Sequence, residues 1–344
     1  VKTEFIPLDY GSFEFKGKNY AMVFGRNSKG ERLCVVDSCP AYFWAILKPN
    51  LSEKKVKEVV EKVEKLGSSG KEKAEVEKVE ICNKKFLEKD VLALKVFVSG
   101  YKNLRKVVEK LNFPEVDKKR GYDVGFITHY IIEKGLLPLH WYEIEGEILD
   151  NSKELGGIGP ALDVDKCIYL SSHKELKGKS EKGFSPKVLA FDIETDDLKI
   201  GKGEILMVSL VSDNLKKVLT WKKVPKAGKY VEFVKDEAEL LEKFAKEVRK
   251  ISPDFLVGYF SDGFDLPYLR ARAEKLGVKL SLGLDGSQPK FQKGAILSAK
   301  ILGISHIDLL RFIQTIYGQY MPVSYTHLRA HETSLHLVCR LLLE

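Results

Sequence analysis

The sequence predicts two α/β-type parts, a small α+β domain followed by an α/β domain with a mixed sheet. Three observations predict this fold class. The length of 344 residues leaves room for two domains. Short apolar runs alternate with helical periods in both halves of the chain. A segment richer in Gly, Ser and Lys lies between the halves, as expected for a boundary between domains.

Residues 1–140 are predicted to form the α+β domain. Strand-like runs at 20–24 and 32–36 flank a turn with the sequence Asn-Ser-Lys-Gly, which indicates a hairpin. Helical periods follow at 52–66 and 104–111, where valines and leucines recur every three or four residues. A further apolar strand separates the two helices, and we expect the helix lysines to face solvent.

Residues 141–186 are predicted to be a surface connection, and residues 187–322 to form the second domain. The elements expected there are strands at 188–194, 205–211 and 217–221, a helix at 236–250, a strand at 255–259 and a helix at 264–276. Consecutive strands joined by short turns favour antiparallel pairing. Three strands, a helix, a strand and a helix follow one another in the ribonuclease H-like fold.

Composition limits the classes of partner. Lys and Arg number 57 against 49 Asp and Glu, and this net charge of +8 suits a polyanionic partner without requiring one. The five cysteines contain no C-x-x-C pair, so neither a disulfide framework nor a zinc knuckle is expected. No apolar run approaches the roughly 18 residues that a membrane span needs. We therefore expect a cytoplasmic protein with no membrane partner.

Three carboxylates are candidates for chemistry. Asp192 and Glu194 stand two positions apart on a predicted strand, so both side chains share one face. A divalent cation would offset the cost of such a pair beside a buried strand. The alternative is a pair of acids at a loop edge, neutralised by lysines. Asp265 opens a helix directly after a strand, where it could be a third metal ligand or a helix cap.

Around these acids the sequence resembles the archaeal-type family B DNA polymerases. The segment with Asp192 and Glu194 is similar to the first exonuclease motif of the family, and Phe264 with Asp265 is similar to the second. Further similar segments are 40–45, 122–126, 134–138, 272–277, 285–289 and 306–309. The likeness covers residues 1 to about 322, an N-terminal template-side domain followed by a ribonuclease H-like exonuclease domain.

The resemblance implies a proofreading 3′→5′ exonuclease that hydrolyses the terminal phosphodiester of DNA. Its cofactors would be two divalent ions, Mg²⁺ or Mn²⁺, about 4 Å apart. By resemblance, Asp192 would bridge both ions and Glu194 would hold the ion that activates water. Asp265 would help to hold the ion at the leaving group.

The same resemblance implies contacts with DNA, both the single-stranded 3′ end and the template strand. Phe260, Phe264 and Thr195 are expected to touch the strand, and Phe260 stands where the family usually has Asn, so stacking would replace a polar contact. Archaeal relatives capture uracil from the template, although Tyr42 could equally be a core residue. The expected uracil pocket residues are Ala41, Tyr42, Leu104 and His129. A sliding clamp would be contacted through parts outside this sequence.

The third exonuclease motif of the family, Tyr-x-x-x-Asp, is not found. Asp308 is the last aspartate, and Tyr320 is followed four positions later by Ser324. The polymerase motifs are absent as well. We therefore expect an N-terminal fragment that is nearly inactive as a nuclease. The alternative is a catalytically incomplete nucleic-acid-binding module, and a stand-alone nuclease would need the full third motif.

Residues 323–344 are expected to be a non-native tail. From 324 onward the sequence resembles a translated sequencing-adapter read-through. His327, His331 and His336 could otherwise lie on a surface helix or bind zinc. No function is assigned to this tail.

Overall fold

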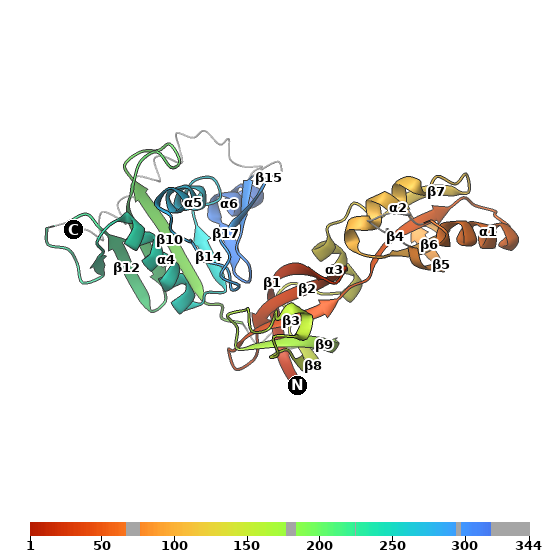
Figure 1. Cartoon of the computed structure of the whole chain (residues 1–344), viewed down its shortest axis with the longest axis horizontal. Helices are drawn as coiled ribbons and strands as arrows, with labels where there is room; N and C mark the ends of the chain where they lie inside the picture. Colours follow the sequence, from red (N-terminus) through yellow and green to blue (C-terminus); the bar gives the residue numbers. More distant parts are fainter. Residues whose placement is uncertain (67–75, 177–183, 224, 294–296, 318–344) are drawn as a thin grey trace. The chain divides into compact units, whose positions relative to one another are not determined.

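The structure is a computed structural model in which two compact units can be described (Figure 1). The described residues are 1–66, 76–176, 184–223, 225–293 and 297–317. Unit 1 comprises Val1–Pro160 with Asp165–Lys177, and unit 2 comprises Ala161–Val164 with Gly178–Glu344. None of the described helices is long and apolar enough to cross a membrane.

A closed barrel forms part of unit 1, with its described strands in the order β1-β2-β3-β9-β8. The strands are β1 (Lys2–Phe15), β2 (Lys18–Arg26), β3 (Arg32–Ser38), β8 (Tyr142–Ile148) and β9 (Lys166–Glu175). The predicted hairpin is confirmed, because β2 and β3 pair antiparallel. In its turn the side chain of Asn27 accepts the N–H groups of Lys29 and Glu31, and Gly30 has a φ of 82°. Phe126 and Tyr130 of α3 (Phe126–Lys134) pack into the barrel core.

The barrel corrects the expectation that residues 141–186 are a surface connection. β8 pairs with β1 and β9, and β9 also pairs in parallel with β3, so this segment contributes two strands to the barrel wall. Its polar composition was misleading because a barrel strand buries one face and exposes the other, which places Glu, Ser and Lys at exposed positions. A short 3₁₀ turn, η2 (Glu154–Gly156), lies between the two strands. Residues 177–183 lie outside the described part of the chain.

A second sheet in unit 1, called here the N-terminal sheet, has the described order β5-β6-β4-β7 with antiparallel pairing throughout. Its elements are β4 (Ala41–Leu47), α1 (Glu53–Glu64), β5 (Val76–Phe86), β6 (Lys89–Val98), η1 (Tyr101–Asn103), α2 (Leu104–Lys110) and β7 (Val116–Arg120). The two predicted helical periods are thus confirmed. Ser52 caps α1 by accepting the N–H of Lys55.

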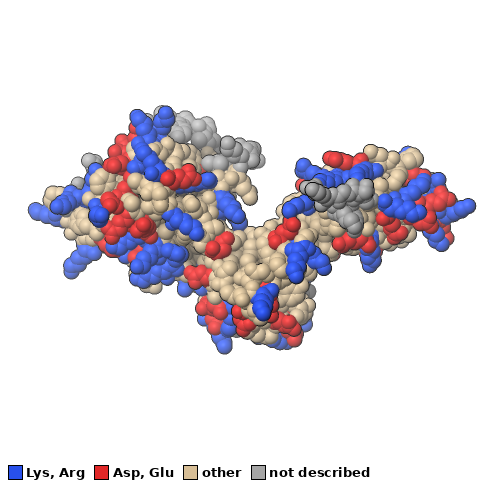
Figure 2. All heavy atoms as spheres, in the orientation of Figure 1, with Lys and Arg blue, Asp and Glu red and all other residues tan. Residues whose placement is uncertain are grey.

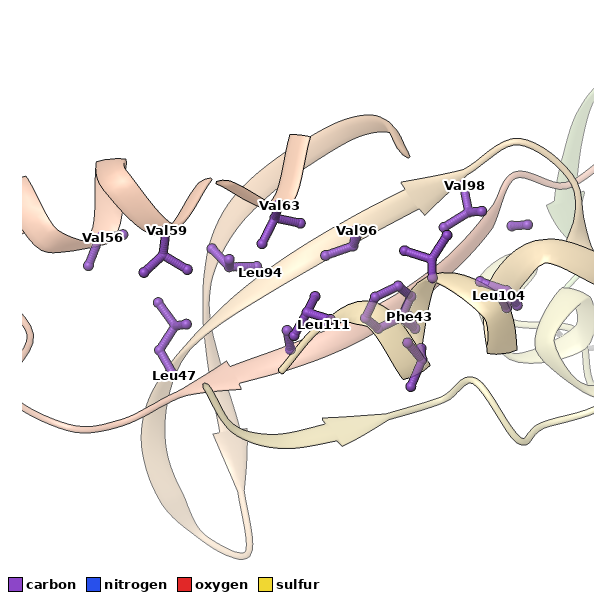
Figure 3. Packing of buried hydrophobic residues seen from close by; sticks show 14 residues of the cluster. Phe43, Leu47, Val56, Val59, Val63, Leu94, Val96, Val98, Leu104 and Leu111 are labelled. Carbon is purple, nitrogen blue, oxygen red and sulfur yellow. The ribbon is translucent and has the colours of Figure 1, made fainter. Parts of the chain in front are cut away.

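One face of the N-terminal sheet packs against its helices. Phe43, Leu94 and Val96 from the strands belong to one buried cluster with Val59 and Val63 of α1 (Figure 3). Because strand side chains alternate between faces, the neighbouring strand residues point to the opposite face of this sheet. That opposite face therefore carries side chains which α1 and α2 do not cover, and one of them, Tyr42, contacts His129 and Glu133 of α3.

Unit 2 is built on a mixed sheet, called here the C-terminal sheet, with the described order β13-β12-β11-β10-β14-β17. Its strands are β10 (Val188–Thr195), β11 (Ile205–Ser212), β12 (Leu215–Thr220), β13 (Val231–Phe233), β14 (Phe255–Gly258) and β17 (Ser305–Asp308). β10, β11 and β12 pair antiparallel, whereas β14 runs parallel to β10 and β17 parallel to β14. The predicted mixed sheet and element order are confirmed, while β13 and β17 were not predicted.

Two helices of unit 2 match the predicted periods. They are α4 (Glu237–Ile251), capped by the side chain of Asp236, and α5 (Asp265–Leu276), which ends at the left-handed Gly277. Outside the prediction are the hairpin of β15 (Lys290–Lys293) and β16 (Leu297–Lys300), and the helix α6 (Leu309–Tyr317).

A buried ion pair ties α4, α5 and β11 together. The guanidinium of Arg272 on α5 bonds to both carboxylate oxygens of Glu237 on α4, and both side chains are about 95% buried. The same carboxylate accepts the N–H of Ile205 at the start of β11, at 2.8 Å. This ion pair therefore fixes the helix that begins with Asp265.

Candidate active site

The strand β10 presents the two expected acids on one face. Phe191 and Ile193 are buried, and the ring of Phe191 lies 5.8 Å from that of Phe244 on α4. Asp192 is exposed and Glu194 half-buried on the other face. Both acids stand inside the strand rather than at a loop edge. Because they are two positions apart, the pleat places their side chains on the same face.

Asp265 reaches β10 from a distant part of the chain. It is the first residue of α5, it is only 3% exposed, and its Oδ1 accepts the backbone N–H of Ile193 at 3.3 Å. β14 pairs with β10 only as far as Ala190, so the N–H of Ile193 is available for this bond. The structure thus brings Asp265 to the stretch of strand between Asp192 and Glu194.

The electrostatics of this place disfavour a third negative charge. Burial raises the pKa of Asp265 well above its ordinary value, and the carboxylates of Asp192 and, more weakly, Asp308 raise it further. The hydrogen bond from Ile193 acts in the opposite direction. A divalent cation would relieve the repulsion between such oxygen ligands, so the chemistry of the donor set fits one. Within the described ranges, however, no three His, Cys, Asp or Glu side chains are grouped closely enough to hold an ion.

Asp308 is a residue of this region that sequence reasoning missed. Its carboxylate accepts the N–H groups of Phe260, Asp262 and Leu310, each at 3.0 Å, and it is 6% exposed. It therefore fastens the loop between β14 and α5, which leads into Asp265, to the end of β17. The available signal was an aspartate that ends one apolar run and opens another in His306-Ile-Asp-Leu309.

A second buried network holds the same loop. Ser261 Oγ lies 2.9 Å from His306 Nε2, and His306 Nδ1 lies 3.4 Å from the carboxylate of Asp262. Arg311 and the N–H of Ala299 also bond to Asp262. Burial opposes the ionised form of Asp262, but these donors hold its pKa below the ordinary value. Ser261 is fully buried, so this Ser-His-Asp chain positions the loop and is not a nucleophilic site.

Phe260 is displayed by this loop in a costly conformation. Its φ is 58°, which a bulky side chain adopts at a cost of about 1–3 kcal/mol, whereas Asn adopts it readily. The side chain is 40% exposed, and its ring lies so close to Gly263 that a Cβ there would come within 2.4 Å of it. The bond to Asp308 and the absence of a side chain at Gly263 thus keep an aromatic ring at the surface.

The other two expected DNA contacts are also near the start of α5 and the end of β10. Phe264 is half-buried, and its ring lies 5.3 Å from that of Tyr268. Thr195 is half-buried and its hydroxyl donates to the carbonyl of Asp197 at 3.0 Å. Thr195 therefore contributes to the local turn, while Phe264 keeps part of its ring accessible.

The residues of the expected uracil pocket are all buried in unit 1. Tyr42 and His129 lie together, with ring centroids 4.3 Å apart, and the Tyr42 hydroxyl donates to Glu133 at 2.5 Å. Ala41 and Leu104 belong instead to the cluster between the N-terminal sheet and its helices. Among the described residues, no group bonds to the buried Nε2 of His129. Burial also lowers the pKa of this imidazole below its ordinary value.

The remaining expectations fall outside the described residues. Tyr320 and Ser324, at which the third motif was sought, lie there, as do the tail 323–344 and its three histidines. Their interpretation stays a prediction.

Comparisons with known proteins agree with this geometry. A family model described as DNA polymerase family B, exonuclease domain, matches residues 117–326. A DNA polymerase of Pyrococcus glycovorans is 34% identical over 278 residues, which are 79% of this chain and 30% of that protein. A DNA polymerase 1 of Pyrococcus abyssi is 32% identical over 304 residues, 87% of this chain and 33% of that protein.

A solved structure is similar over most of the chain. The family B DNA polymerase from the hyperthermophilic archaeon Pyrobaculum calidifontis matches with a TM-score of 0.71 and 25% identity, covering 90% of this chain and 37% of that one. The chain thus spans about a third of the length of these relatives.

Proposed function

Because this chain belongs to family B of the DNA polymerases and carries the exonuclease domain of that family, we propose that unit 2 acts as a 3′→5′ exonuclease on DNA. One observation carries the proposal. Asp265 bonds to the N–H of Ile193, between Asp192 and Glu194, although 72 positions separate the bonded residues in the sequence. Convergence of acids from separate segments is typical of a catalytic carboxylate site.

Exonuclease domains of this family depend on metal ions, and we propose two, Mg²⁺ or Mn²⁺, held by Asp192, Glu194 and Asp265. When bound, such ions activate water and stabilise negative charge on the leaving oxygen. The chain itself supplies the placement. Asp265 is anchored on β10 through the N–H of Ile193, and Phe191 and Ile193 fix the pleat that holds Asp192 and Glu194 on one face.

The loop before α5 would receive the end of the strand. Phe260 has an exposed ring. Phe264 is the residue directly before Asp265 at the start of α5. Unpaired bases stack on such rings with little sequence preference. We propose that these two rings, with Thr195 beside them in the site, orient the terminal nucleotide so that its phosphate faces the carboxylates.

Template reading in unit 1 is a separate proposal. Tyr42 and His129 would contact a template uracil near Ala41 and Leu104. The buried Nε2 of His129, to which no group of the described residues bonds, supports this role. A single strand with deoxyuridine in place of thymidine would then bind more tightly, and His129→Leu would remove the difference. Equal affinities of the native chain for both strands would contradict the proposal.

We propose that DNA polymerase activity and a sliding-clamp contact reside in the part of the whole protein that corresponds to the relatives' length outside this chain. We propose that the whole protein copies DNA in the cytoplasm, with unit 2 correcting the growing end. The family membership of the chain supports this proposal.

The direct test of the exonuclease is shortening of a 5′-labelled single strand. We expect slow loss of nucleotides from the 3′ end with Mg²⁺ or Mn²⁺, no loss with EDTA, and arrest when the terminal phosphodiester is replaced by a non-hydrolysable linkage. A 3′-labelled strand should release mononucleotides first. Shortening from the 5′ end, or shortening that persists in EDTA, would contradict the proposal.

The same experiment distinguishes a nucleic-acid-binding module without nuclease activity. The observation in its favour is that no three acids in the described residues are grouped closely enough to hold an ion. Tight binding of the strand without any shortening would support that alternative.

A further inference from the structure

Charge singles out no further site on the surface that Figure 2 shows, because Lys and Arg are interspersed with Asp and Glu over both units in that view. A pair of thiols in the barrel wall of unit 1 is more distinctive. Cys34 of β3 and Cys167 of β9 stand directly opposite each other on two neighbouring parallel strands (Figure 1). More than 100 positions separate them in the sequence, so no C-x-x-C pattern marks the pair.

Both thiols lie on the same side of the barrel wall. Leu33 and Val35 of β3 and Ile168 of β9 belong to the core inside the barrel. Because strand side chains alternate, Cys34 and Cys167 point to the opposite side, where they are 0% and 4% exposed. Neighbouring strands lie about 4.8 Å apart, within the range of roughly 4.4–6.8 Å between Cα atoms that a disulfide spans.

Backbone hydrogen bonds around the pair fix its register. Asp165 donates its N–H to the carbonyl of Arg32 at 2.9 Å, and its Oδ2 accepts the N–H of Arg32 at 2.7 Å. The N–H of Leu149 donates to the carbonyl of Cys167 at 2.8 Å. These bonds resist a slip of β9 along β3, which would separate the two cysteines. The fold therefore keeps the thiols beside each other.

The two thiols differ in how readily they ionise. Burial raises the pKa of Cys34 well above its ordinary value, and the hydrogen bond to Cys167 raises it further. The same hydrogen bond lowers the pKa of Cys167, although burial acts against this effect. Cys167 is therefore the thiol that more readily gives a thiolate, which is the form that reacts with oxidants.

The other described cysteines are placed differently. Cys39 belongs to the core inside the barrel, on the other side of the wall from the pair. Cys82 lies on β5 of the N-terminal sheet, where Ala93 of β6 stands opposite it. All four described cysteines are free thiols, and only Cys34 and Cys167 among them are register partners.

We propose that Cys34 and Cys167 form a reversible disulfide that fastens β9 to β3, with hydrogen peroxide as the oxidant. The thiolate of Cys167 attacks one peroxide oxygen and the O–O bond breaks, which leaves a sulfenic acid on Cys167 and a hydroxide that takes up a proton. The sulfur of Cys34 then attacks that of Cys167. The S–S bond forms, the S–O bond breaks, and the hydroxide leaves as water with the proton of Cys34.

In total the two thiols lose two electrons and two protons, and the peroxide becomes two molecules of water. A thiol reductant reverses the reaction by exchange. The disulfide would close a loop of more than 100 residues, which restricts the unfolded chain more than the folded one. We therefore expect oxidation to stabilise the pairing of β9 with β3.

The product is identified in the whole chain, in EDTA so that metal-catalysed oxidation is suppressed. After peroxide treatment the chain is unfolded, its remaining thiols are alkylated, and its peptides are analysed by mass spectrometry without reduction. The disulfide between Cys34 and Cys167 should be the main product, and dithiothreitol should remove it. Oxidation of the chain in urea should instead give mixed pairings, because the selection of this pair depends on the fold.

Single substitutions test the role of each thiol. In Cys34→Ala, Cys167 should remain as a sulfenic acid that dimedone traps. In Cys167→Ala, the thiol of Cys34 should stay reduced at the same peroxide concentration. Cys39→Ala is the matched control, because it also removes a buried thiol of unit 1 and should leave disulfide formation unchanged.

Pulsed hydrogen exchange during heating measures the effect on the barrel. Each chain is compared with its own reduced form, so any loss of packing caused by a substitution cancels. Peroxide should raise the temperature at which β9 opens by about 5 °C in the native chain and in Cys39→Ala. It should have no such effect in Cys34→Ala or Cys167→Ala.

Four results would overturn the proposal, and the first three come from the native chain, whose folding no substitution affects. These three are free thiols at Cys34 and Cys167 after peroxide treatment, a sulfinic acid on Cys167 beside an unreacted Cys34, and a main product that joins either residue to Cys39, Cys82 or Cys339. The fourth is an equal rise of the opening temperature in Cys34→Ala.

Discussion

Replacing Arg272 with Met is expected to lower the free energy of unfolding of unit 2 by about 3–5 kcal/mol. Met has a similar length but no charge, so Glu237 would remain buried without its partner. The single bond from the N–H of Ile205 cannot compensate for the loss of both guanidinium bonds. Loss of protection in α4 and α5 during hydrogen exchange, with urea unfolding of the whole chain, measures the effect.

The matched control for this prediction is Arg270→Ala, two positions earlier on the same helix. Arg270 pairs with Glu274 at 2.8 Å, but both side chains are largely exposed. Solvent and salt screen such pairs, so the expected loss is below about 1 kcal/mol. Changing Arg272 to Met and Glu237 to Gln together should recover part of the stability, because no buried charge is left unpaired. Equal effects of the two single substitutions would contradict the role given to the buried pair.

The parts of the fold that the sequence predicted are those with local signals. The turn of the β2–β3 hairpin lies directly between its two strands in the sequence. The helices α1 and α4 carry their own caps and apolar periods. β8 and β9 were missed because their pairing partners, β1 and β3, lie more than 100 positions away and their exposed faces are polar. β8 does alternate, with Tyr142 and Ile144 buried and Glu145 and Glu147 exposed, but this short pattern does not indicate which distant strands it pairs with.

The candidate site shows the same division. The shared face of Asp192 and Glu194 follows from the pleat, and the position of Asp265 at a helix start follows from the helical period. That Asp265 bonds to β10, and that Asp308 holds the loop before it, depends on the packing of β17 beside β14. No property of residues 305–308 alone indicates that neighbour.

The second large effect concerns the missing third motif. No aspartate follows Asp308 in the sequence, so the ions of the proposed site would have fewer carboxylate ligands than the family motif provides. Underligated Mg²⁺ fills its coordination shell with water and is held less rigidly, which disfavours preorganised catalysis. We expect that replacing residues 323–344 with the segment that follows in a relative will raise nuclease activity by orders of magnitude.

The most direct test of the carboxylate site is the single-turnover rate of 3′ shortening in that extended chain, with and without Asp192→Ala. Asp236→Asn is the matched control, because it changes an acid of the same unit that caps α4. We predict that Asp192→Ala abolishes shortening while strand binding and the Asp236→Asn rate stay close to those of the extended chain. Shortening at a comparable rate in the Asp192→Ala chain would show that the acids on β10 do not perform the reaction.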